Sequence, residues 1–514
     1  MAAAAPLTIF DTSIDVDDRL QQSEYERQRL ANVRPPTWRN PPPSREPYDL
    51  VVIGGGPAGL VSAEAAVELG ARVAIVERNA LGGNCLNFGC VPSKALIRTS
   101  RVYADIHSAA HYGARASIGG DVEFAAIMER MRRIRARISR VDSARRLVER
   151  GIDVFFGDGA FAGRHRIDVA GATLSFRRAI VATGARPDTP KVPGLAQAGY
   201  LTNETVFDLA VLPKRLLVIG GGPLGCELAQ AFCRFGARTT IAQDQPLFLP
   251  REERDAAQLL SEALARDGVE VRLNTAAVRV RVDDGAKVVD LVSDDYHSRI
   301  VVDEILTGVG RVPNVDGLNL EAAGIAYDAS GIATDDFLRT TNPRVYAAGD
   351  VTLAHAYTHT ADASARIVVR NALLGKKARV SALTIPWCTY TDPEIAHVGL
   401  YVREARERDI PVRTFTIPMH DVDRAITDGE ELGFVKIHVH DHSDRILGAT
   451  IVARHAGEMI NEITLAMVAN IGLATLARVI HAYPTQAEAI RAAAIAFERS
   501  QQPVRRRATR FVPW

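Results

Sequence analysis

The hydrophobic pattern of the chain changes sharply near Tyr48. Residues 49–53 form a short apolar run, an alanine-rich helical stretch follows to Leu69, and a second apolar run over residues 73–76 ends at Glu77. Short apolar runs on either side of a helix are typical of buried parallel strands. The pattern therefore predicts a strand–helix–strand unit at this point of the chain.

The turn between the first strand and the helix has the glycine spacing of a dinucleotide-binding turn. Its glycines are Gly54, Gly56 and Gly59. Such a turn lets a pyrophosphate approach the backbone at the helix N-terminus. Glu77 lies 21 residues beyond Gly56, where a carboxylate can accept hydrogen bonds from ribose hydroxyls. The combination predicts a dinucleotide site, and the alternative is a glycine turn in an unrelated α/β protein.

The same arrangement recurs further along the chain. An expected strand over residues 215–219 leads into a second set of glycines, Gly220, Gly222 and Gly225, and a helix and a strand over residues 239–242 follow. Two copies of one fingerprint imply two nucleotide ligands with hydride passing between them. The chain is therefore expected to bind a second dinucleotide.

The residue that follows the second unit bears on the choice of nicotinamide cofactor. Gln243 holds the place of Glu77, and its amide does not repel a 2′-phosphate as a carboxylate would. The neighbouring Asp244 would repel one, which weakly favours NADH over NADPH. Three arginines could reverse this preference: Arg238, Arg251 and Arg254.

Two cysteines five positions apart, Cys85 and Cys90, lie between the two glycine turns. Pro92 suits the first turn of a helix, so Cys90 is expected at or just before a helix N-terminus. The helix dipole favours a thiolate there. These features predict a redox-active disulfide. The alternatives are two unrelated cysteines, or half of a zinc site that no second Cys/His pair completes.

Other segments show weaker signals. An arginine-rich helical region is expected at about 120–150, and a strand then ends in Ala-Thr-Gly at residues 182–184, where the chain is expected to cross between domains. A later strand ends in Gly349-Asp350, which can bind a sugar or polyol hydroxyl. Gly-Asp is also a common turn pair, so this signal has little weight alone.

Composition excludes several classes of protein. The 514 residues allow two or three domains, and 62 basic against 61 acidic residues do not suggest nucleic acid or an anionic membrane as partner. Five cysteines are too few for a disulfide-stapled secreted fold and suit a reducing compartment. Neither a signal peptide nor a membrane span is expected, which predicts a soluble cytoplasmic protein.

The two ends of the chain differ from its middle. Residues 1 to about 47 are expected to be an extension rather than part of a core, because the proline-rich segment 34–43 cannot propagate a helix or pair centrally in a sheet. Trp38 is the residue expected to anchor this extension. From about 380 the chain is β-rich, and helices follow from Gly457, which predicts a separate α+β domain with an apolar face. The basic tail at residues 505–507 is expected to be a solvated end.

The order of these motifs resembles the FAD-dependent pyridine nucleotide–disulfide oxidoreductases over residues 48 to 500. The group includes lipoamide dehydrogenase, glutathione reductase and mercuric reductase. The resemblance implies an α/β fold with two Rossmann-like domains, which bind FAD and NAD(P)H, and a C-terminal α+β dimerisation domain in a homodimer. The expected segments are the N-terminal extension (1–47), the FAD domain in two parts (48–190 and 316–378), the NAD(P) domain (191–315) and the dimerisation domain (379–514).

The resemblance also implies roles for individual residues. Cys90 would be the thiol next to the flavin, and Cys85 the thiol that meets the substrate. Lys94 and Glu227 would lie by the flavin ring and the nicotinamide. The remaining residues expected to bind cofactors, with Asp350 near the FAD ribityl chain, are Gly54, Gly56, Gly59, Glu77, Gly83, Thr183, Gly184, Gly220, Gly222, Gly225, Gln243, Gly310, Gly349 and Asp350.

The chain departs from the family near its C-terminus. Disulfide reductases of this family carry a His-Pro-Thr-x-x-Glu motif there, but here Tyr483 holds the place of the histidine, five residues before Glu488. A phenol of pKa about 10 is a poor base for a thiol. Mercuric reductase-like members also carry tyrosine, and Asp423-Arg-Ala resembles the same branch. His481 is either a substitute base or a helix-end histidine without a role.

These residues predict a flavoenzyme in which NAD(P)H reduces FAD, FAD reduces the Cys85–Cys90 disulfide, and Cys85 reduces a small-molecule acceptor. The acceptor is left open among Hg(II), a disulfide, a quinone and oxygen. High-affinity mercury detoxification is not expected, because the sequence has no cysteine after Cys388 and no N-terminal Cys-x-x-Cys motif. The alternatives are a lipoamide dehydrogenase and a non-catalytic, FAD-stabilised interaction protein. No metal site is expected.

Overall fold

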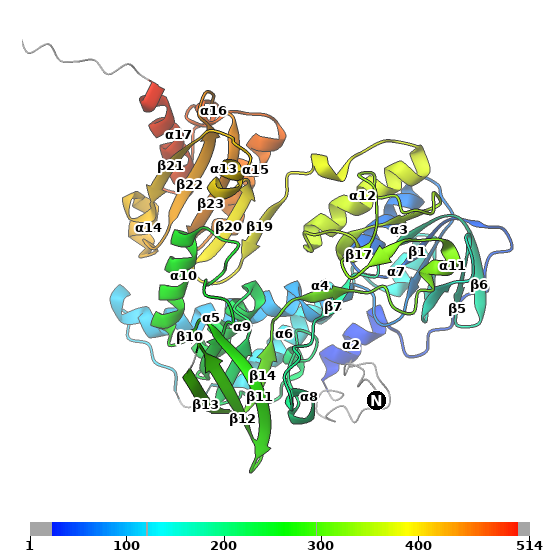
Figure 1. The fold of residues 1–514 in the computed structure, drawn as a ribbon, viewed down its shortest axis with the longest axis horizontal. Helices are drawn as coiled ribbons and strands as arrows, with labels where there is room; N and C mark the ends of the chain where they lie inside the picture. Colours follow the sequence, from blue (N-terminus) through cyan, green and yellow to red (C-terminus); the bar gives the residue numbers. More distant parts are fainter. Residues whose placement is uncertain (1–22, 120–121, 295, 502–514) are drawn as a thin grey trace, which may run out of the picture. The chain divides into compact units, whose positions relative to one another are not determined.

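The computed structural model describes residues 23–119, 122–294 and 296–501 (Figure 1). They divide into two compact units. The first unit contains the chain up to residue 249 together with residues 264–383, and the second contains residues 250–263 together with the chain from residue 384. Residues 1–22 of the extension and the basic tail at 505–507 lie outside the described residues.

A seven-stranded sheet forms one half of the first unit, in the order β3-β2-β1-β6-β5-β4 with β18 beside β6. Its strands are β1 (Tyr48–Ile53), β2 (Val73–Glu77), β3 (Ile152–Phe156), β4 (Gly159–Phe161), β5 (Arg166–Val169), β6 (Ala172–Val181) and β18 (Val345–Ala347). The strands β3, β2, β1, β6 and β18 run parallel, whereas β4 and β5 run antiparallel to their neighbours. Five of the six residues of β1 are buried, as the apolar run predicted.

A second parallel sheet carries the repeated unit, in the order β10-β9-β8-β14. Its strands are β8 (Arg215–Ile219), β9 (Arg238–Ala242), β10 (Glu270–Arg272) and β14 (Glu304–Thr307). An antiparallel sheet of β11 (Thr275–Asp283), β12 (Ala286–Ser293) and β13 (Tyr296–Val302) adjoins it in sequence. The unit also contains two antiparallel two-stranded pairs: β7 (Ala185–Pro187) with β15 (Arg311–Pro313), and β16 (Tyr327–Asp328) with β17 (Gly331–Ile332).

Helices cover these sheets and carry the residues of interest. They are α3 (Pro57–Glu68), α4 (Gly83–Phe88), α5 (Cys90–Ser108), α6 (Phe124–Ile138), α7 (Ala144–Glu149), α8 (Leu195–Ala198), α9 (Pro223–Arg234), α11 (Leu320–Ala323) and α12 (Thr358–Leu374). Both α3 and α9 begin with a proline directly after a glycine turn, as the repeated pattern predicted. Among the described residues, no helix combines the length and the apolar character that a membrane-spanning segment needs.

Part of the N-terminal extension belongs to the core, contrary to expectation. Residues Glu24–Val33 form helix α2, and Val33 is fully buried in the same apolar cluster as Leu81. Trp38 does anchor the extension, because its indole packs edge-on against Phe156 at 5.6 Å and donates a hydrogen bond to Val154 O. The proline-rich segment had obscured the helix that precedes it.

The second unit is built on a five-stranded antiparallel sheet in the order β19-β20-β23-β22-β21. Its strands are β19 (Pro386–Thr389), β20 (Glu394–Gly399), β21 (Val412–Pro418), β22 (Phe434–His440) and β23 (Ile446–Ala453), and its helices are α13 (Val402–Glu407), α14 (Asp423–Asp428), α15 (Ala456–Val468), α16 (Leu473–Leu476) and α17 (Glu488–Gln501). All eight residues of β23 are buried. Helices α15 and α17 pack their apolar side chains into this core.

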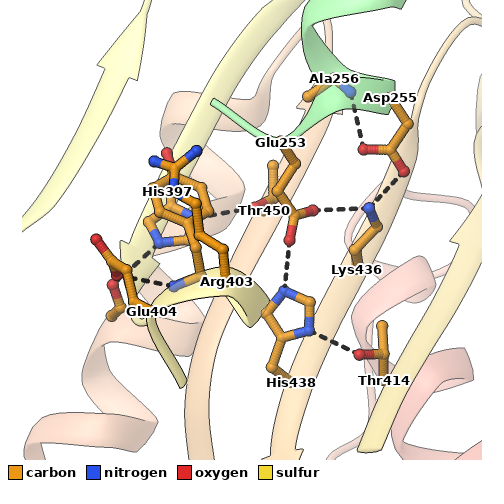
Figure 2. Close-up of polar contacts among 12 residues, drawn as sticks. Glu253, Asp255, Ala256, His397, Arg403, Glu404, Thr414, Lys436, His438 and Thr450 are labelled. Carbon is orange, nitrogen blue, oxygen red and sulfur yellow. Dashed lines mark hydrogen bonds and ion pairs between the residues drawn. The ribbon is translucent and has the colours of Figure 1, made fainter. Parts of the chain in front are cut away.

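The second unit also contains a segment that the sequence assigned to the NAD(P) domain. Residues 250–263 include the start of helix α10 (Arg254–Asp267). Figure 2 shows Glu253 between His438 and Lys436, at 3.0 and 2.7 Å, and Asp255 paired with the same lysine. Polar contacts, which no hydrophobic pattern reveals, therefore attach this segment to the C-terminal sheet.

Candidate active site

The glycines of the two turns divide into those that close the turn and those that leave room for a ligand. A Cβ at Gly59 would lie 1.8 Å from Gly54 O, and one at Gly225 would lie 2.3 Å from Gly220 O. These positions therefore require glycine for the close helix–strand approach. At Gly56 the nearest atom to a Cβ would be Gly83 Cα at 3.7 Å, so the backbone there remains accessible to a pyrophosphate.

The acid at the end of the first unit holds the glycine turn together. Glu77 is buried and accepts hydrogen bonds of 2.6 Å from the backbone N–H groups of Gly55 and Asn79. Burial raises the pKa of the carboxyl, against these two hydrogen bonds. Gln243 repeats the contact in the second unit, since its Oε1 accepts from Gly221 N at 2.7 Å. Both side chains thus stabilise the turns at the positions where a ribose was expected.

The two cysteines lie on consecutive helices rather than in an open loop. Cys85 is on α4, a short helix that the sequence did not predict, and Cys90 is the first residue of α5. The predicted place of Cys90 at a helix N-terminus is confirmed. Both cysteines are free thiols, with Cys85 half-buried and Cys90 exposed. Cys226, in contrast, is fully buried on α9 and is a core residue.

Hydrogen bonding makes the two thiols unequal. The hydrogen bond between Cys85 and Cys90 is the largest cause that lowers the pKa of Cys90 to about 6. The Thr358 hydroxyl, 3.3 Å from Cys90 Sγ, and the charge of Lys94 lower this pKa further. The same thiol–thiol contact and burial raise the pKa of Cys85. Cys90 is therefore largely a thiolate at neutral pH, while Cys85 keeps its proton.

A partly buried ion pair lies close to these thiols. Lys94, on the second turn of α5, places Nζ 2.7 Å from Oε2 of Glu227 on α9. The Glu227 side chain is 4% exposed and that of Lys94 is 36% exposed. The structure thus joins two residues that the sequence places 133 positions apart. Lys94 supplies the positive charge that favours the Cys90 thiolate.

The other predicted cofactor residues gather at the strand ends of the first unit. Thr183 donates a hydrogen bond of 2.7 Å to Asn314 O, and the Asn314 amide donates back to Thr183 O at 2.9 Å. Asp350 pairs with Arg311 at 2.7 Å. Four further glycines of the predicted set have positive φ: Gly83 (52°), Gly184 (68°), Gly310 (128°) and Gly349 (74°). Gly222 directly precedes α9 and has extended backbone.

The C-terminal residues predicted for catalysis lie in the second unit. Tyr483 is exposed and donates a hydrogen bond of 2.9 Å to Asp423, and this contact raises the pKa of the phenol. Glu488 begins α17 and accepts a weak hydrogen bond from Thr485 N at 3.5 Å. His481 lies 3.0 Å from the Glu462 carboxylate. The raised pKa leaves even less of Tyr483 as phenolate at neutral pH, so little of it can act as a base.

Several residues around the thiols were not identified from the sequence. Thr358 begins α12 and contacts Cys90, and Asn87 on α4 bonds Leu81 O and Gly83 O at 3.1 and 2.9 Å. Asn87 lies between the two cysteines, and Thr358 precedes His359, which stacks on Tyr357 at 5.4 Å. Only Asn87 could have been suspected from the sequence, because it lies between the two cysteines. Nothing in the sequence links Thr358 to Cys90.

The residues present fit FAD in the first glycine turn. The open backbone at Gly56 can receive a pyrophosphate, and α3 begins directly beyond it with its N–H groups at the turn. Glu77 and Asp350 supply carboxylates for hydroxyl groups, and Asp350 is half-buried. The described residues include no group of three His, Cys, Asp or Glu side chains placed to hold a metal ion.

A thiol pair placed between two dinucleotide-binding turns is the arrangement of an oxidoreductase that couples a nicotinamide to a dithiol. Residues 48–366 match the family described as pyridine nucleotide-disulphide oxidoreductase, and residues 385–494 match its dimerisation domain. The chain belongs to this family. It is a class I enzyme, an FAD-dependent NAD(P)H oxidoreductase, as the resemblance implied.

Individual relatives have different activities. A mercuric reductase from Lysinibacillus sphaericus is 33% identical over 453 residues, which cover 88% of this chain and 83% of that protein. A dihydrolipoyl dehydrogenase from Chlamydia muridarum is 32% identical over 450 residues, which cover 86% and 95%. The Cu(II) complex of the HOCl-induced flavoprotein disulfide reductase RclA from Escherichia coli matches with a TM-score of 0.77 and 29% identity, over 86% of this chain and 98% of that chain.

Proposed function

We propose that the Cys85–Cys90 pair transfers electrons from FAD to a thiophilic metal ion, Hg(II) or Cu(II). The observation that carries this proposal is the pair of free, unequal thiols: Cys90 has a pKa of about 6, while the pKa of Cys85 is raised. Thiolates are the ligands that soft metal ions prefer. The mercuric reductase relative and the Cu(II) complex of RclA support this class of acceptor.

The residues of this chain have distinct tasks in the transfer. Bound FAD would accept hydride from the nicotinamide and supply two electrons to the sulfur pair. Cys90 forms the thiolate beside Lys94, and Cys85 on α4 contacts the acceptor after losing its proton to solvent. Closing the disulfide releases two electrons, which reduce one Hg(II) to the metal or two Cu(II) to Cu(I).

Tyr483 argues against a dithiol as the natural substrate. Oxidation of a dithiol needs a base that removes a thiol proton, and a phenol whose pKa is raised by Asp423 does not serve at neutral pH. A metal ion needs ligands rather than deprotonation. Tyr483 and Glu488 are proposed to complete the acceptor site of the partner subunit in a homodimer.

The dimer and the choice of cofactor are parts of the same proposal. The dimerisation domain carries exposed apolar side chains at Leu465, Val468 and Ile480, the last 93% exposed. NADH is proposed as the preferred donor, because Gln243 and Asp244 follow the end of β9 directly whereas Arg238 begins the strand. Ligands bind at the carboxyl ends of parallel strands, away from Arg238. The five free cysteines suit a cytoplasmic location.

A second candidate, oxidation of dihydrolipoamide, is favoured by one contact. His481 Nε2 lies 3.0 Å from Glu462, and a carboxylate that orients an imidazole is the usual support of a histidine base. In this alternative His481 takes over the role of the missing histidine. The dihydrolipoyl dehydrogenase relative is consistent with it.

Steady-state assays distinguish the two candidates. The purified full chain with FAD is supplied with NADH or NADPH and then with Hg(II) plus excess thiol, Cu(II) or glutathione disulfide, and dihydrolipoamide is tested with NAD⁺. The proposal expects metal-dependent oxidation of NADH that Cys85→Ser abolishes and His481→Ala leaves unchanged. Dihydrolipoamide turnover that exceeds metal reduction and disappears in His481→Ala would establish the second candidate instead.

A further inference from the structure

Helix α2 of the N-terminal extension is bonded to the helix that carries Cys85. The guanidinium of Arg29, which is fully buried, donates to the Asn87 side-chain oxygen and to Glu26. Arg135 on α6 donates to Asn87 O at 2.9 Å and to Glu26 at 2.7 Å. Asn87 therefore receives a hydrogen bond from each arginine and lies two residues after Cys85.

Asn87 transmits these contacts to the backbone around the thiols. Its amide donates to Leu81 O, two residues before the start of α4, and to Gly83 O, the first residue of that helix. This helix has six residues, which is too short to be stable by itself. The position of Cys85 consequently depends on the groups that hold the ends of α4.

Two further contacts tie the end of α2 to the same segment. The backbone carbonyl of Val33 accepts a hydrogen bond of 3.0 Å from Leu81 N, and Arg34 donates to Asn79 O at 2.7 Å. The extension thus binds the redox segment on both sides of Leu81. Contacts of α2 with other elements exist as well, such as the hydrogen bond of 2.9 Å from Asn32 to Ser139.

The buried cluster of Glu26, Arg29 and Arg135 keeps its charges. Burial alone would raise the pKa of Glu26, but Arg135 and Arg29 lower it to about 2. Asp208, whose pKa burial raises to about 6, is a further acid in the field of the two arginines. A buried ionic network is a costly way to gain stability, and the best-attested use of such networks is to fix one geometry.

We infer that Arg29, Glu26, Arg135 and Asn87 are positioning residues that fix Cys85 relative to Cys90, so that the N-terminal extension is a working part of the thiol relay. This inference rests on the proposed function of the two cysteines. The inference concerns only the geometry of the two thiols and does not depend on which acceptor they reduce. The substitutions therefore should change thiol chemistry more than they change overall stability.

Three variants of the full chain test the inference. Arg29→Met removes the guanidinium, and Arg29→Lys keeps the charge beside Glu26 but loses the planar fork that reaches Asn87. Asn32→Ala is the matched control, since it loosens the same helix from α6 without a contact to α4. Circular dichroism and thermal unfolding record the folding of each protein. If Arg29→Met does not fold, Arg29→Lys carries the test.

The measurement is made on the dithiol itself. After anaerobic reduction with dithiothreitol and its removal, peptide mass spectrometry follows iodoacetamide labelling of Cys85 and Cys90 at several pH values. Disulfide closure is then timed with diamide, which takes up the two electrons and two protons that the thiols lose. For Arg29→Lys, we expect at least a ten-fold slower closure and at least a five-fold change in the Cys85:Cys90 labelling ratio. Asn32→Ala should stay within two-fold of wild type.

Equal behaviour of Arg29→Lys and Asn32→Ala would overturn the inference. A different result would refute the proposed function of the two cysteines: unchanged turnover of the acceptor in Cys85→Ser. Labelling and diamide closure do not involve an acceptor, so they remain informative in that case. The two failures can thus be told apart.

Discussion

The sulfur of Cys90 lies 3.3 Å from the hydroxyl oxygen of Thr358. The two residues are 268 positions apart, and each stands at the first turn of its helix, α5 and α12. A hydroxyl at this distance can donate a hydrogen bond to a thiolate. It therefore stabilises the charged form of Cys90 in addition to the larger effect of Cys85.

Replacing Thr358 with valine should raise the pKa of Cys90 from about 6 to about 7, because a hydrogen bond to a charged group contributes about 1.5 kcal/mol. The thiolate fraction at pH 7 would fall to about one half. The pH profile of iodoacetamide labelling at Cys90 measures this change. Thr360→Val is the matched control, since the Thr360 hydroxyl is buried on the same helix without a hydrogen-bond partner among the described residues. The same labelling profile in both variants would show that the Thr358 hydroxyl does not stabilise the Cys90 thiolate.

The ion pair of Lys94 and Glu227 should affect Cys90 with opposite signs. The charge of Lys94 lowers the pKa of Cys90 and that of Glu227 raises it. Lys94→Met is therefore expected to shift the labelling profile of Cys90 to higher pH, and Glu227→Gln to lower pH. Lys94→Met should also cost about 2 kcal/mol of stability, because it leaves the buried Glu227 carboxylate without this ion pair. Shifts in the same direction would show that the two charges do not act on the thiol.

Much of the fold followed from periodicity, whereas the short and polar elements did not. The two strand–helix–strand units were predictable because the strands β1, β2 and β8 are rich in apolar residues and because Gly59 and Gly225 are sterically required. Helix α4 was missed, because Gly83-Asn-Cys-Leu-Asn-Phe has weak helix propensity and is held by Asn87 and its neighbours. Tertiary hydrogen bonds decide such an element.

The N-terminal helix offered a signal that the prolines obscured. Ser23 followed by Glu26 has the spacing of a capping box at a helix start. In the structure Ser23 does precede α2, although its hydroxyl donates to Glu129 at 3.1 Å rather than capping the helix. Contacts such as that of Arg29 with Asn87, 58 positions apart, depend on tertiary packing and could not be read from the pattern.

The acid stability of the second unit should depend on Glu253. Burial alone would raise the pKa of Glu253, but the hydrogen bond from His438 and the ammonium of Lys436 lower it to about 2 from 4.5 (Figure 2). A carboxyl with a depressed pKa stabilises the folded state above its unfolded pKa. That contribution, on the order of 3 kcal/mol, is lost as the pH falls from about 4.5 to about 2.

Glu253→Gln removes this pH-dependent contribution. Its unfolding free energy, from urea titrations between pH 2 and pH 6, should depend less steeply on pH than that of wild type in this window. Glu407→Gln, on the exposed side of α13, is the control and should keep the wild-type slope. If the unfolding free energies of wild type and Glu253→Gln depended on pH equally steeply, Glu253 would not be the source of this acid sensitivity.

Tyr483→His tests whether the C-terminal tyrosine selects the acceptor. The substitution supplies an imidazole where the phenol now donates to Asp423 at 2.9 Å, and an imidazole of pKa near 6.5 can remove a thiol proton at neutral pH. General base catalysis typically contributes about 10²–10⁴-fold, so turnover of dihydrolipoamide should rise by at least ten-fold. Metal reduction should not gain, because a metal ion needs no deprotonation. Tyr483→Phe is the control: it removes the hydroxyl without adding a base, so a gain in dithiol activity there would refute the role assigned to the tyrosine.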